Sequence, residues 1–365
     1  MDSQTNWGKW LLGIIIVVIV IFIAMKANPA STPAVSTGGK TIKIGIIAPE
    51  TGQAAIFGNA VVKSVALAQK DLRQTQNTYQ VLVEDDGSNP GQAASAAQKL
   101  INVDHVDALI TVTTGTGNAA KPLVIAAKIP NICIACTDPN IADGKYSFNY
   151  SMAPDTEAKG WLKAAQGKEI KTVAMFTQIH PGINVLADAV EKNAPEYGIR
   201  IVYKQRYEAN MRDFRTQIVE AKQKTPDMFF MINFPPSVDI LGQQLKDLGV
   251  KNISSESAFG LAAKPEIFNG FWFGDFPLAD ESLRTRFETE NPTLRFSFRS
   301  GPSGYDAFTL LVKGFEQGVD MSSYISGLQS YTGVAGTAIK SKDNLVFELS
   351  PRMYVIQDGR QMLAQ

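Results

Sequence analysis

Short β-branched runs alternate with helical stretches over most of this chain of 365 residues. The expected strands cover residues 41–47, 79–83, 108–112, 132–135, 172–176, 200–203 and 228–232. Between them apolar residues recur at helical spacing, as from Val61 to Leu72, and Asn89 followed by Pro90 marks the start of another helix. Such alternation favours parallel sheets with helices on both faces, so we expect an α/β fold.

The series is interrupted near residue 151 and then begins again, which predicts two doubly wound parallel-sheet lobes joined by a hinge. The first lobe is expected to comprise residues 40–151 and 277–334, and the second lobe residues 152–276 and 335–365. Ligands of open α/β sheets bind beyond the carboxyl ends of the strands. Two facing lobes would therefore form a binding cleft at these strand ends.

The N-terminal part of the chain has the composition of a membrane segment. Residues 10–25 carry no charge and are flanked by Lys9 and Lys26. As a helix this run would extend about 24 Å, slightly less than a bilayer core of about 30 Å, and the flanking lysines can cover the difference. We expect a short flank at 1–9, a single transmembrane anchor at 10–26 and a flexible linker at 27–39, with a cleaved signal segment as the alternative.

The overall composition argues against several function classes. Lys+Arg 35 balances Asp+Glu 35, so no basic face for nucleic acid is expected. Two His and two Cys leave little for a metal cluster, and the chain has no phosphate-binding glycine loop and no nucleophile elbow. We expect neither a metal nor a cofactor, and no enzymatic activity.

Two neighbouring strand ends carry threonines that are suited to bind an anion. The strand at 108–112 continues into Thr113, Thr114 and Gly115 at a helix start, where hydroxyl and amide groups meet partial positive charge. The next strand is followed by Thr137, so the two ends could grip one carboxylate from both sides. The alternatives are a helix cap that binds nothing and a turn that Asp138-Pro139 forms without any ligand.

Further candidates follow other predicted strands. Phe57 and Phe234 are expected to cover an apolar ligand, with core packing as the alternative, and His180 is expected to face the cleft. Glu256 could neutralise an ammonium group or be a solvated loop carboxylate. Cys133 and Cys136 form a C-x-x-C pattern inside an apolar strand, which favours buried thiols over a redox motif or half of a zinc site. Residues 84–86 form an acidic run that is typical of a turn before the helix cap at residue 89.

The order of these motifs resembles the type I periplasmic binding proteins of the leucine/isoleucine/valine-binding class, which are the receptor subunits of ABC importers. The resemblance covers residues 40–359 and rests on Ile42-Lys43-Ile44-Gly45-Ile46-Ile47-Ala48-Pro49, Thr51-Gly52, Phe57-Gly58, Glu84-Asp85-Asp86, Asn89-Pro90, Ala94-Ser95-Ala96-Ala97-Gln98-Lys99-Leu100, Gly304-Tyr305-Asp306-Ala307 and Tyr354-Val355-Ile356-Gln357-Asp358-Gly359.

The resemblance implies a role for each candidate residue. Thr114, with Gly115 beside it, would hold the ligand carboxylate, and Thr137 and the carbonyl of Ala135 would contribute carboxylate and ammonium contacts. Phe57 and Phe234 would line the side-chain pocket, and the ammonium-binding acid lies near Glu256. Two departures from the family pattern concern this pocket: Phe57 and Phe234 lack the tyrosine hydroxyl, and His180-Pro181-Gly182 replaces an aromatic-Gly pair.

We therefore expect a membrane-tethered, extracytoplasmic solute-binding protein that captures an amino-acid-like ligand and delivers it to the permease subunits of an ABC importer. A ligand sensor of the same fold without transport and a receptor for an amide or another carboxylate are the alternatives. An enzyme on the same scaffold is a third hypothesis, because a fold does not determine a function.

Overall fold

The computed structural model describes residues 39–277, 280–296, 300–341 and 346–364. Thr41–Gln365 forms one compact unit. The predicted anchor at 10–26 and nearly all of the predicted linker lie outside the described residues. Within the described ranges, no helix is long and apolar enough to cross a membrane.

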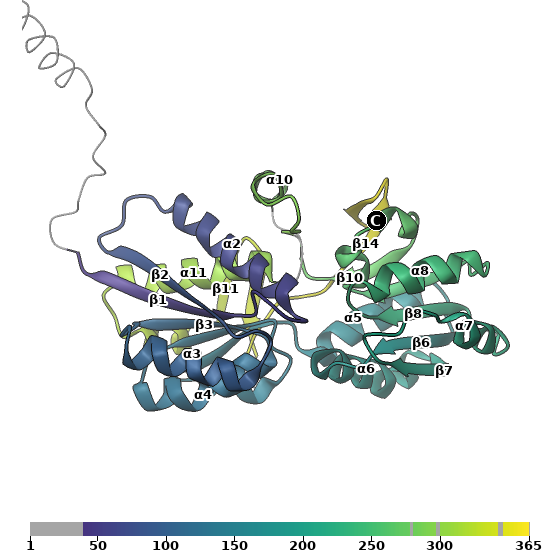
Figure 1. Cartoon of the computed structure of the whole chain (residues 1–365), viewed down its shortest axis with the longest axis horizontal. Helices are drawn as coiled ribbons and strands as arrows, with labels where there is room; N and C mark the ends of the chain where they lie inside the picture. Colours follow the sequence, from purple (N-terminus) through teal and green to yellow (C-terminus); the bar gives the residue numbers. More distant parts are fainter. Residues whose placement is uncertain (1–38, 278–279, 297–299, 342–345, 365) are drawn as a thin grey trace, which may run out of the picture. The chain divides into compact units, whose positions relative to one another are not determined.

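The first of two sheets has eight strands in the order β11-β12-β13-β5-β4-β3-β1-β2. Figure 1 labels β1, β2, β3 and β11 of this sheet. Its strands are β1 (Thr41–Ala48), β2 (Thr78–Asp85), β3 (Ala108–Val112), β4 (Asn131–Ile134), β5 (Ser147–Ser151), β11 (Ser330–Gly333), β12 (Gly336–Lys340) and β13 (Phe347–Glu348). Its helices are α2 (Ala55–Asp71), α3 (Pro90–Asn102), α4 (Thr114–Ala127), α11 (Gly301–Glu316) and α12 (Met321–Gly327), with α10 (Glu281–Glu290) packed beside α2. β1 to β5 are parallel to one another.

Alternation along β1 explains why helices cover both faces of this sheet. Ile44 and Ile46 belong to the core that α2 and α11 close, whereas Ile47 belongs to the core beneath α3 and α4. Successive side chains of a strand point to opposite faces, so one apolar run serves both cores. Gly45 permits close packing on the second face, since a Cβ there would lie 2.6 Å from Leu109 Cδ2.

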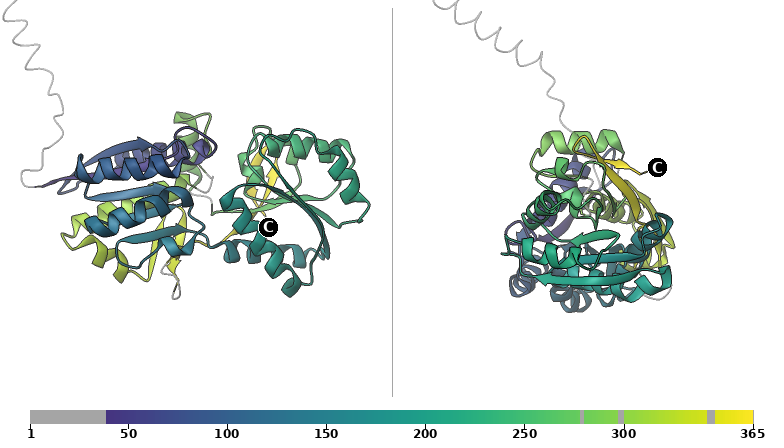
Figure 2. Two further views of the ribbon diagram at one scale, coloured as in Figure 1. Left: turned by 60° about the horizontal axis from the view of Figure 1, so that its bottom comes forward. Right: turned by 90° about the vertical axis from the view of Figure 1, so that its right-hand side faces the viewer.

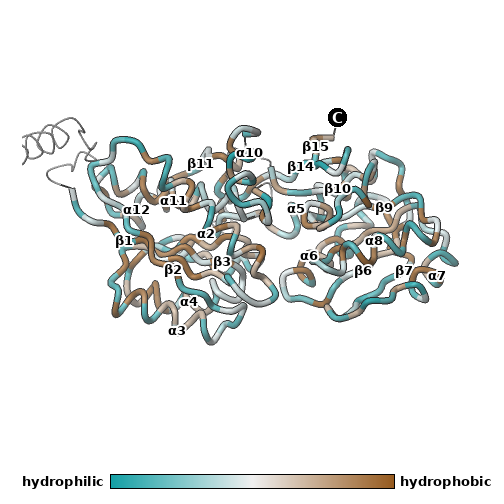
Figure 3. The backbone as a smooth tube through the Cα atoms, turned by 45° about the horizontal axis from the view of Figure 1, so that its top comes forward, coloured by the Kyte–Doolittle hydropathy of each residue, from teal (hydrophilic) through white to brown (hydrophobic). Residues whose placement is uncertain are grey.

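The second sheet has seven strands in the order β15-β14-β10-β9-β8-β6-β7. Its strands are β6 (Thr172–Gln178), β7 (Arg200–Tyr207), β8 (Met228–Ile232), β9 (Ile253–Glu256), β10 (Trp272–Asp275), β14 (Arg352–Gln357) and β15 (Arg360–Leu363). Its helices are α5 (Pro154–Gly167), α6 (Pro181–Asn193), α7 (Arg215–Lys222), α8 (Ser237–Asp247) and α9 (Ala258–Leu261), which lie on both faces (Figure 2). Hydrophobic residues concentrate along the strands and the helix faces toward them (Figure 3).

The α/β architecture and the two lobes confirm the expectation from the sequence, with two differences. β11–β12, β12–β13, β10–β14 and β14–β15 pair antiparallel, so the sheets are mixed and not wholly parallel. β12 and β13 belong to the first sheet, although the sequence assigned residues 335–365 to the second lobe. The reason is a long-range pairing: β13 lies parallel to β5 of the first lobe, and β12 and β11 follow outward from β13 as antiparallel neighbours.

A buried carboxylate joins three segments of the first lobe. Asp306 on α11 is 1% exposed, and its Oδ1 accepts from Val334 N at 2.6 Å. Its Oδ2 accepts from Ala335 N at 2.9 Å and from the Tyr150 hydroxyl at 2.9 Å. Burial raises the pKa of Asp306 to about 6, because desolvation disfavours the charged form more than these donors stabilise it.

Gly304→Ala is expected to lower the free energy of unfolding by about 1–3 kcal/mol, because overpacking forces the surrounding structure to shift. A Cβ at Gly304 would lie 2.4 Å from Ser64 Oγ and 3.1 Å from Val61 Cα, where α11 meets α2. Gly167→Ala is the matched control in a helix, because the described structure has no atom within 4 Å of that Cβ position. Equal urea midpoints for the two variants would contradict this account of the packing.

Tyr150→Phe is expected to cost about 1–3 kcal/mol of stability at pH 8, because it removes a hydrogen bond to a charged, buried group. The folded-state pKa of Asp306 is raised to about 6, so its contribution to stability is complete below pH 3.8 and is lost as the pH rises through 6. The cost of Tyr150→Phe should therefore be smaller at pH 4.5, where the carboxyl is protonated. Urea unfolding at both pH values measures the difference.

The control for this prediction is Tyr331→Phe. Tyr331 is buried beside Tyr150, but its hydroxyl bonds to Thr309 Oγ1 at 2.9 Å, which is a neutral partner. Its removal should change stability by the same amount at both pH values. A pH-dependent cost for Tyr331→Phe as large as that for Tyr150→Phe would refute the role of Asp306.

Candidate functional site

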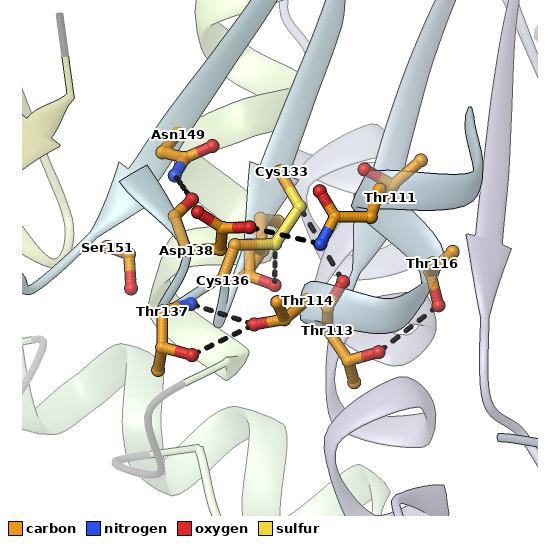
Figure 4. The surroundings of a disulfide bond; sticks show 12 residues. Thr111, Thr113, Thr114, Thr116, Cys133, Cys136, Thr137, Asp138, Asn149 and Ser151 are labelled. Carbon is orange, nitrogen blue, oxygen red and sulfur yellow. Dashed lines mark hydrogen bonds between the residues drawn. A yellow bond between two sulfur atoms is a disulfide. The ribbon is translucent and has the colours of Figure 1, made fainter. Parts of the chain in front are cut away.

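Two threonines meet at the carboxyl ends of β3 and β4 (Figure 4). Thr114 is the first residue of α4, which follows β3, and Thr137 comes shortly after β4. Their hydroxyl oxygens are 3.0 Å apart, and Thr137 N donates to Thr114 Oγ1 at 2.9 Å. β3 and β4 are adjacent and parallel, so their carboxyl ends lie at one edge of the sheet. The structure thus brings together the two residues that the sequence predicted as a pair.

The pairing leaves one hydroxyl hydrogen for a ligand. Two hydroxyl groups carry two hydrogens, and the mutual bond between Thr114 and Thr137 uses one of them. The first amides of α4 lie beside the pair, and within the described structure Thr113 makes no side-chain cap with them. Such amides are donors that an anion can satisfy. The arrangement therefore presents donors, as a carboxylate requires.

Three strand ends continue through a residue with left-handed backbone. Thr113 has φ 79°, Ala135 has φ 55° and Ser257 has φ 58°, and these residues follow β3, β4 and β9. Positive φ is unfavourable for residues with a Cβ, and most of all for a β-branched residue such as Thr113. Residues in such conformations cluster at binding and active sites. Ala135, whose carbonyl the resemblance assigns to the ligand, is one of them.

An aromatic cluster joins residues of both lobes. The rings of Phe57 on α2 and Phe234 after β8 are 5.3 Å apart and edge-to-face. His180 also contacts Phe234 edge-to-face, with ring centroids 5.2 Å apart. Phe57 is buried, while Phe234 and His180 are half-buried. The structure therefore groups these three predicted pocket residues in one apolar wall.

His180 is fixed by the helix that follows it. Its Nδ1 accepts from Gly182 N at 3.2 Å, so that the side chain caps α6. Burial lowers the pKa of His180, which favours the neutral ring. A neutral ring that accepts at Nδ1 carries its hydrogen at Nε2, and this group is the donor. A Cβ at Gly182 would lie 3.9 Å from Thr137 Oγ1, so the start of α6 lies near the threonine pair.

Glu256 is the last residue of β9 and is only 2% exposed. Its carboxylate lies over Gly274 of β10, where a Cβ would be 2.2 Å from Oε1. The alternative of a solvated loop carboxylate is therefore wrong. Its role toward an ammonium group stays a prediction.

The two cysteines do not form free thiols, which corrects the expectation from the sequence. Cys133 and Cys136 are joined by a disulfide, and both are buried. Their apolar strand correctly predicted burial, but burial does not determine whether two thiols pair. The C-x-x-C spacing in a protein expected outside the cytoplasm was the signal for this bond.

The acidic run before α3 organises loops around the site, as the interpretation of a turn required. Asp85 accepts from the amides of Glu50 at 2.9 Å and Gly87 at 2.8 Å. Asp86 is completely buried and accepts from the Thr116 hydroxyl, which joins β2 to the first turn of α4. Asn89 caps α3 as predicted. Within the described residues, no group of three or more His, Cys, Asp or Glu side chains is placed to hold a metal ion.

Residues 41–356 match the family described as periplasmic binding protein. The chain belongs to this family. Its members are solute-binding proteins and not enzymes, which confirms the expectation that the chain has no enzymatic activity. The match includes every candidate site residue and every strand of both sheets except β15 and the last residue of β14.

Sequence relatives are distant. The chain is 22% identical over 238 residues to a leucine-, isoleucine-, valine-, threonine- and alanine-binding protein of Pseudomonas aeruginosa. This alignment covers 63% of each protein. It is 22% identical over 255 residues to the Leu/Ile/Val-binding protein of Escherichia coli, covering 62% of this chain and 68% of that protein. The alignment with a Leu/Ile/Val-binding protein homolog of Brucella abortus spans 61% of that protein's length.

Solved structures share the fold over almost their whole length. A branched-chain amino acid transporter substrate-binding protein from Streptococcus pneumoniae, in complex with isoleucine, has a TM-score of 0.78 at 19% identity and covers 89% of this chain and 99% of that one. A solute-binding protein from Rhodopseudomonas palustris, in complex with 3,4-dihydroxybenzoic acid, has a TM-score of 0.74 at 19% identity, with 88% and 95% covered. At these identities the likeness shows the fold alone.

Thr114→Ala and Thr137→Ala are each expected to weaken ligand binding by about 1–3 kcal/mol, because a charged ligand group loses a hydrogen bond. The double variant should lose less than the sum, since the two hydroxyls share one bond. Calorimetric titration of the folded variants measures the affinity. Thr114→Ser and Thr137→Ser keep the hydroxyl and serve as controls. Unchanged affinity in both alanine variants would remove the threonine pair from the site.

Proposed function

We propose that this protein is an extracytoplasmic receptor that captures an amino acid between its two lobes and delivers it to an ABC importer. The hydrogen-bonded pair of Thr114 and Thr137 is the observation that carries the proposal. Hydroxyl and amide donors at two adjacent strand ends suit a carboxylate, which every free amino acid contains. The family supplies the context of solute binding.

The rest of the proposed site draws on both lobes, with Phe57 and Ala135 from the first and Phe234, His180 and Glu256 from the second. Phe57, Phe234 and His180 would contact the ligand side chain, and Glu256 and the carbonyl of Ala135 would contact its ammonium group. An apolar side chain fits the two phenyl rings, and the branched-chain ligand of the Streptococcus pneumoniae relative is of this kind. His180 adds one donor to this otherwise apolar wall.

Capture would proceed by closure of the two lobes. A ligand that contacts residues of both lobes stabilises the closed state by its differential affinity for that state. The permease would then receive the closed form. A transmembrane anchor at 10–26 and a linker at 27–39 would keep the receptor near its permease and so raise the effective concentration. A sensor that reports closure to a receptor partner without transport uses the same site.

An aromatic carboxylate is the second candidate ligand. The edge-to-face cluster of Phe57, Phe234 and His180 offers ring surfaces, and the neutral His180 offers a donor to a phenol oxygen. The relative from Rhodopseudomonas palustris binds a molecule of this class, 3,4-dihydroxybenzoic acid. Its carboxylate would occupy the same threonine pair and leave Glu256 without an ammonium partner in the ligand.

A thermal-shift screen of Thr41–Gln365, which is a compact unit by itself, tests the proposal. The panel contains aliphatic, aromatic, polar and acidic L-amino acids, benzoates and short amides. A ligand at a hundred times its dissociation constant should stabilise the fold by about 2.7 kcal/mol. A shift with aliphatic or aromatic amino acids supports amino-acid capture. A shift with benzoates or amides alone would replace the amino acid as ligand, and no shift with any compound would contradict the proposal.

A further inference from the structure

We propose that the Cys133–Cys136 disulfide positions the threonine pair, so that the oxidised chain is the form competent to bind. The identity of the ligand in this proposal rests on the function proposed above. The way in which the threonine pair is held does not depend on that function. The bond closes the segment that leaves β4, directly before Thr137.

The disulfide lies between the two strand ends that carry the threonines. A Cβ on Gly117, in the first turn of α4, would lie 2.3 Å from Cys133 Sγ and 3.4 Å from Cys136 Sγ. The bond therefore packs directly on the helix turn that begins with Thr114 (Figure 4). Cys133 and Cys136 form a small buried cluster with Ile141, apart from the main core of the lobe.

The segment that the bond closes needs such a constraint. Ala135 lies between the two cysteines and has φ 55°, a conformation that residues with a Cβ avoid. A short closed loop restricts the extended conformations that Ala135 would otherwise prefer. Thr137 follows Ala135 by two residues, and its backbone amide donates to Thr114 Oγ1. Release of the loop would therefore disturb this hydrogen bond first.

Formation of the bond removes two electrons and two protons from the Cys133 and Cys136 thiols. A disulfide oxidant takes them up by thiol–disulfide exchange and becomes a dithiol. Compartments outside the cytoplasm supply oxidants of this class. Both cysteines are buried in the folded protein, at 0% and 2% exposure, so the completed bond is shielded from solvent.

The test compares the unsubstituted chain with Cys133→Ala/Cys136→Ala, a variant that introduces no buried hydroxyl. Hydrogen exchange followed by mass spectrometry reports the amides of residues 131–140, and the amides of β6 serve as an internal reference. We expect at least tenfold faster exchange at residues 135–138 with no change at β6. For L-isoleucine, or the panel member that gives the largest thermal shift, we expect a dissociation constant about tenfold higher.

A second comparison keeps both cysteines. Gly117→Ala places a Cβ against the sulfur atoms and should also accelerate exchange at residues 135–138, whereas Gly167→Ala, in another helix, should not. If the double variant does not fold, Gly117→Ala and the wild-type chain refolded with a phosphine reductant take its place. Equal exchange at residues 135–138 in oxidised and disulfide-free protein would overturn the proposal.

The exchange measurement needs no ligand, so it separates this proposal from the proposed function. Fast exchange without binding of any panel compound would support the positioning role and contradict amino-acid capture. If loss of the disulfide left exchange at residues 135–138 unchanged while the protein bound an amino acid strongly, the result would contradict the positioning role and support amino-acid capture. If the disulfide stabilised the fold as a whole and did not position the pair, its removal would lower the melting temperature and raise exchange at β6 as well.

Discussion

The proximity of two parallel strand ends is the constraint on which the candidate site depends. In the parallel pair of β3 and β4, Leu109 lies opposite Asn131 and Val112 lies opposite Ile134. Both strands therefore end at the same level of the sheet. Because each strand is followed immediately by a threonine-containing turn, their hydroxyls meet without any long side chain reaching across. The first turn of α4 and the buried Cys133–Cys136 disulfide pack against each other and hold these two turns. The wall of aromatic rings is contributed by α2 and by the second lobe.

Close packing of small residues supports this arrangement in the first lobe. Gly45 allows β1 to approach Leu109, Gly117 allows α4 to approach the disulfide, and Gly304 allows α11 to approach α2. Each of these glycines lies in a regular element, where its use is the missing side chain and not a special backbone angle. A larger residue at any of the three would move an element that carries or supports the site. The position of the threonine pair therefore depends on close packing at several places in the first lobe.

The elements that sequence reasoning located correctly are those with strong local signals. β3 and β8 begin and end at the predicted residues, and Asn89 caps α3 as its position before a proline indicated. The pairing of Thr114 with Thr137 was also predictable, because adjacent parallel strands end together. The sheet to which β12 and β13 belong was not, since pairing between distant segments leaves no local pattern. The disulfide was missed because an apolar strand indicates burial, and burial is compatible with either redox state of Cys133 and Cys136. The contact of Phe57 with Phe234 depends on the tertiary structure in the same way.

The capping role of His180 has a consequence for recognition. Its ring is bound through Nδ1 to the first turn of α6, at the positive end of that helix, where a second positive charge is unfavourable. The capping bond and the burial of the ring therefore both favour the neutral imidazole, with its hydrogen at Nε2. In the proposed site, Nε2 would therefore donate to a ligand atom that directs a lone pair along the N–H bond. A ligand with a hydrogen-bond donor in that place would be rejected, because two donors would then face each other.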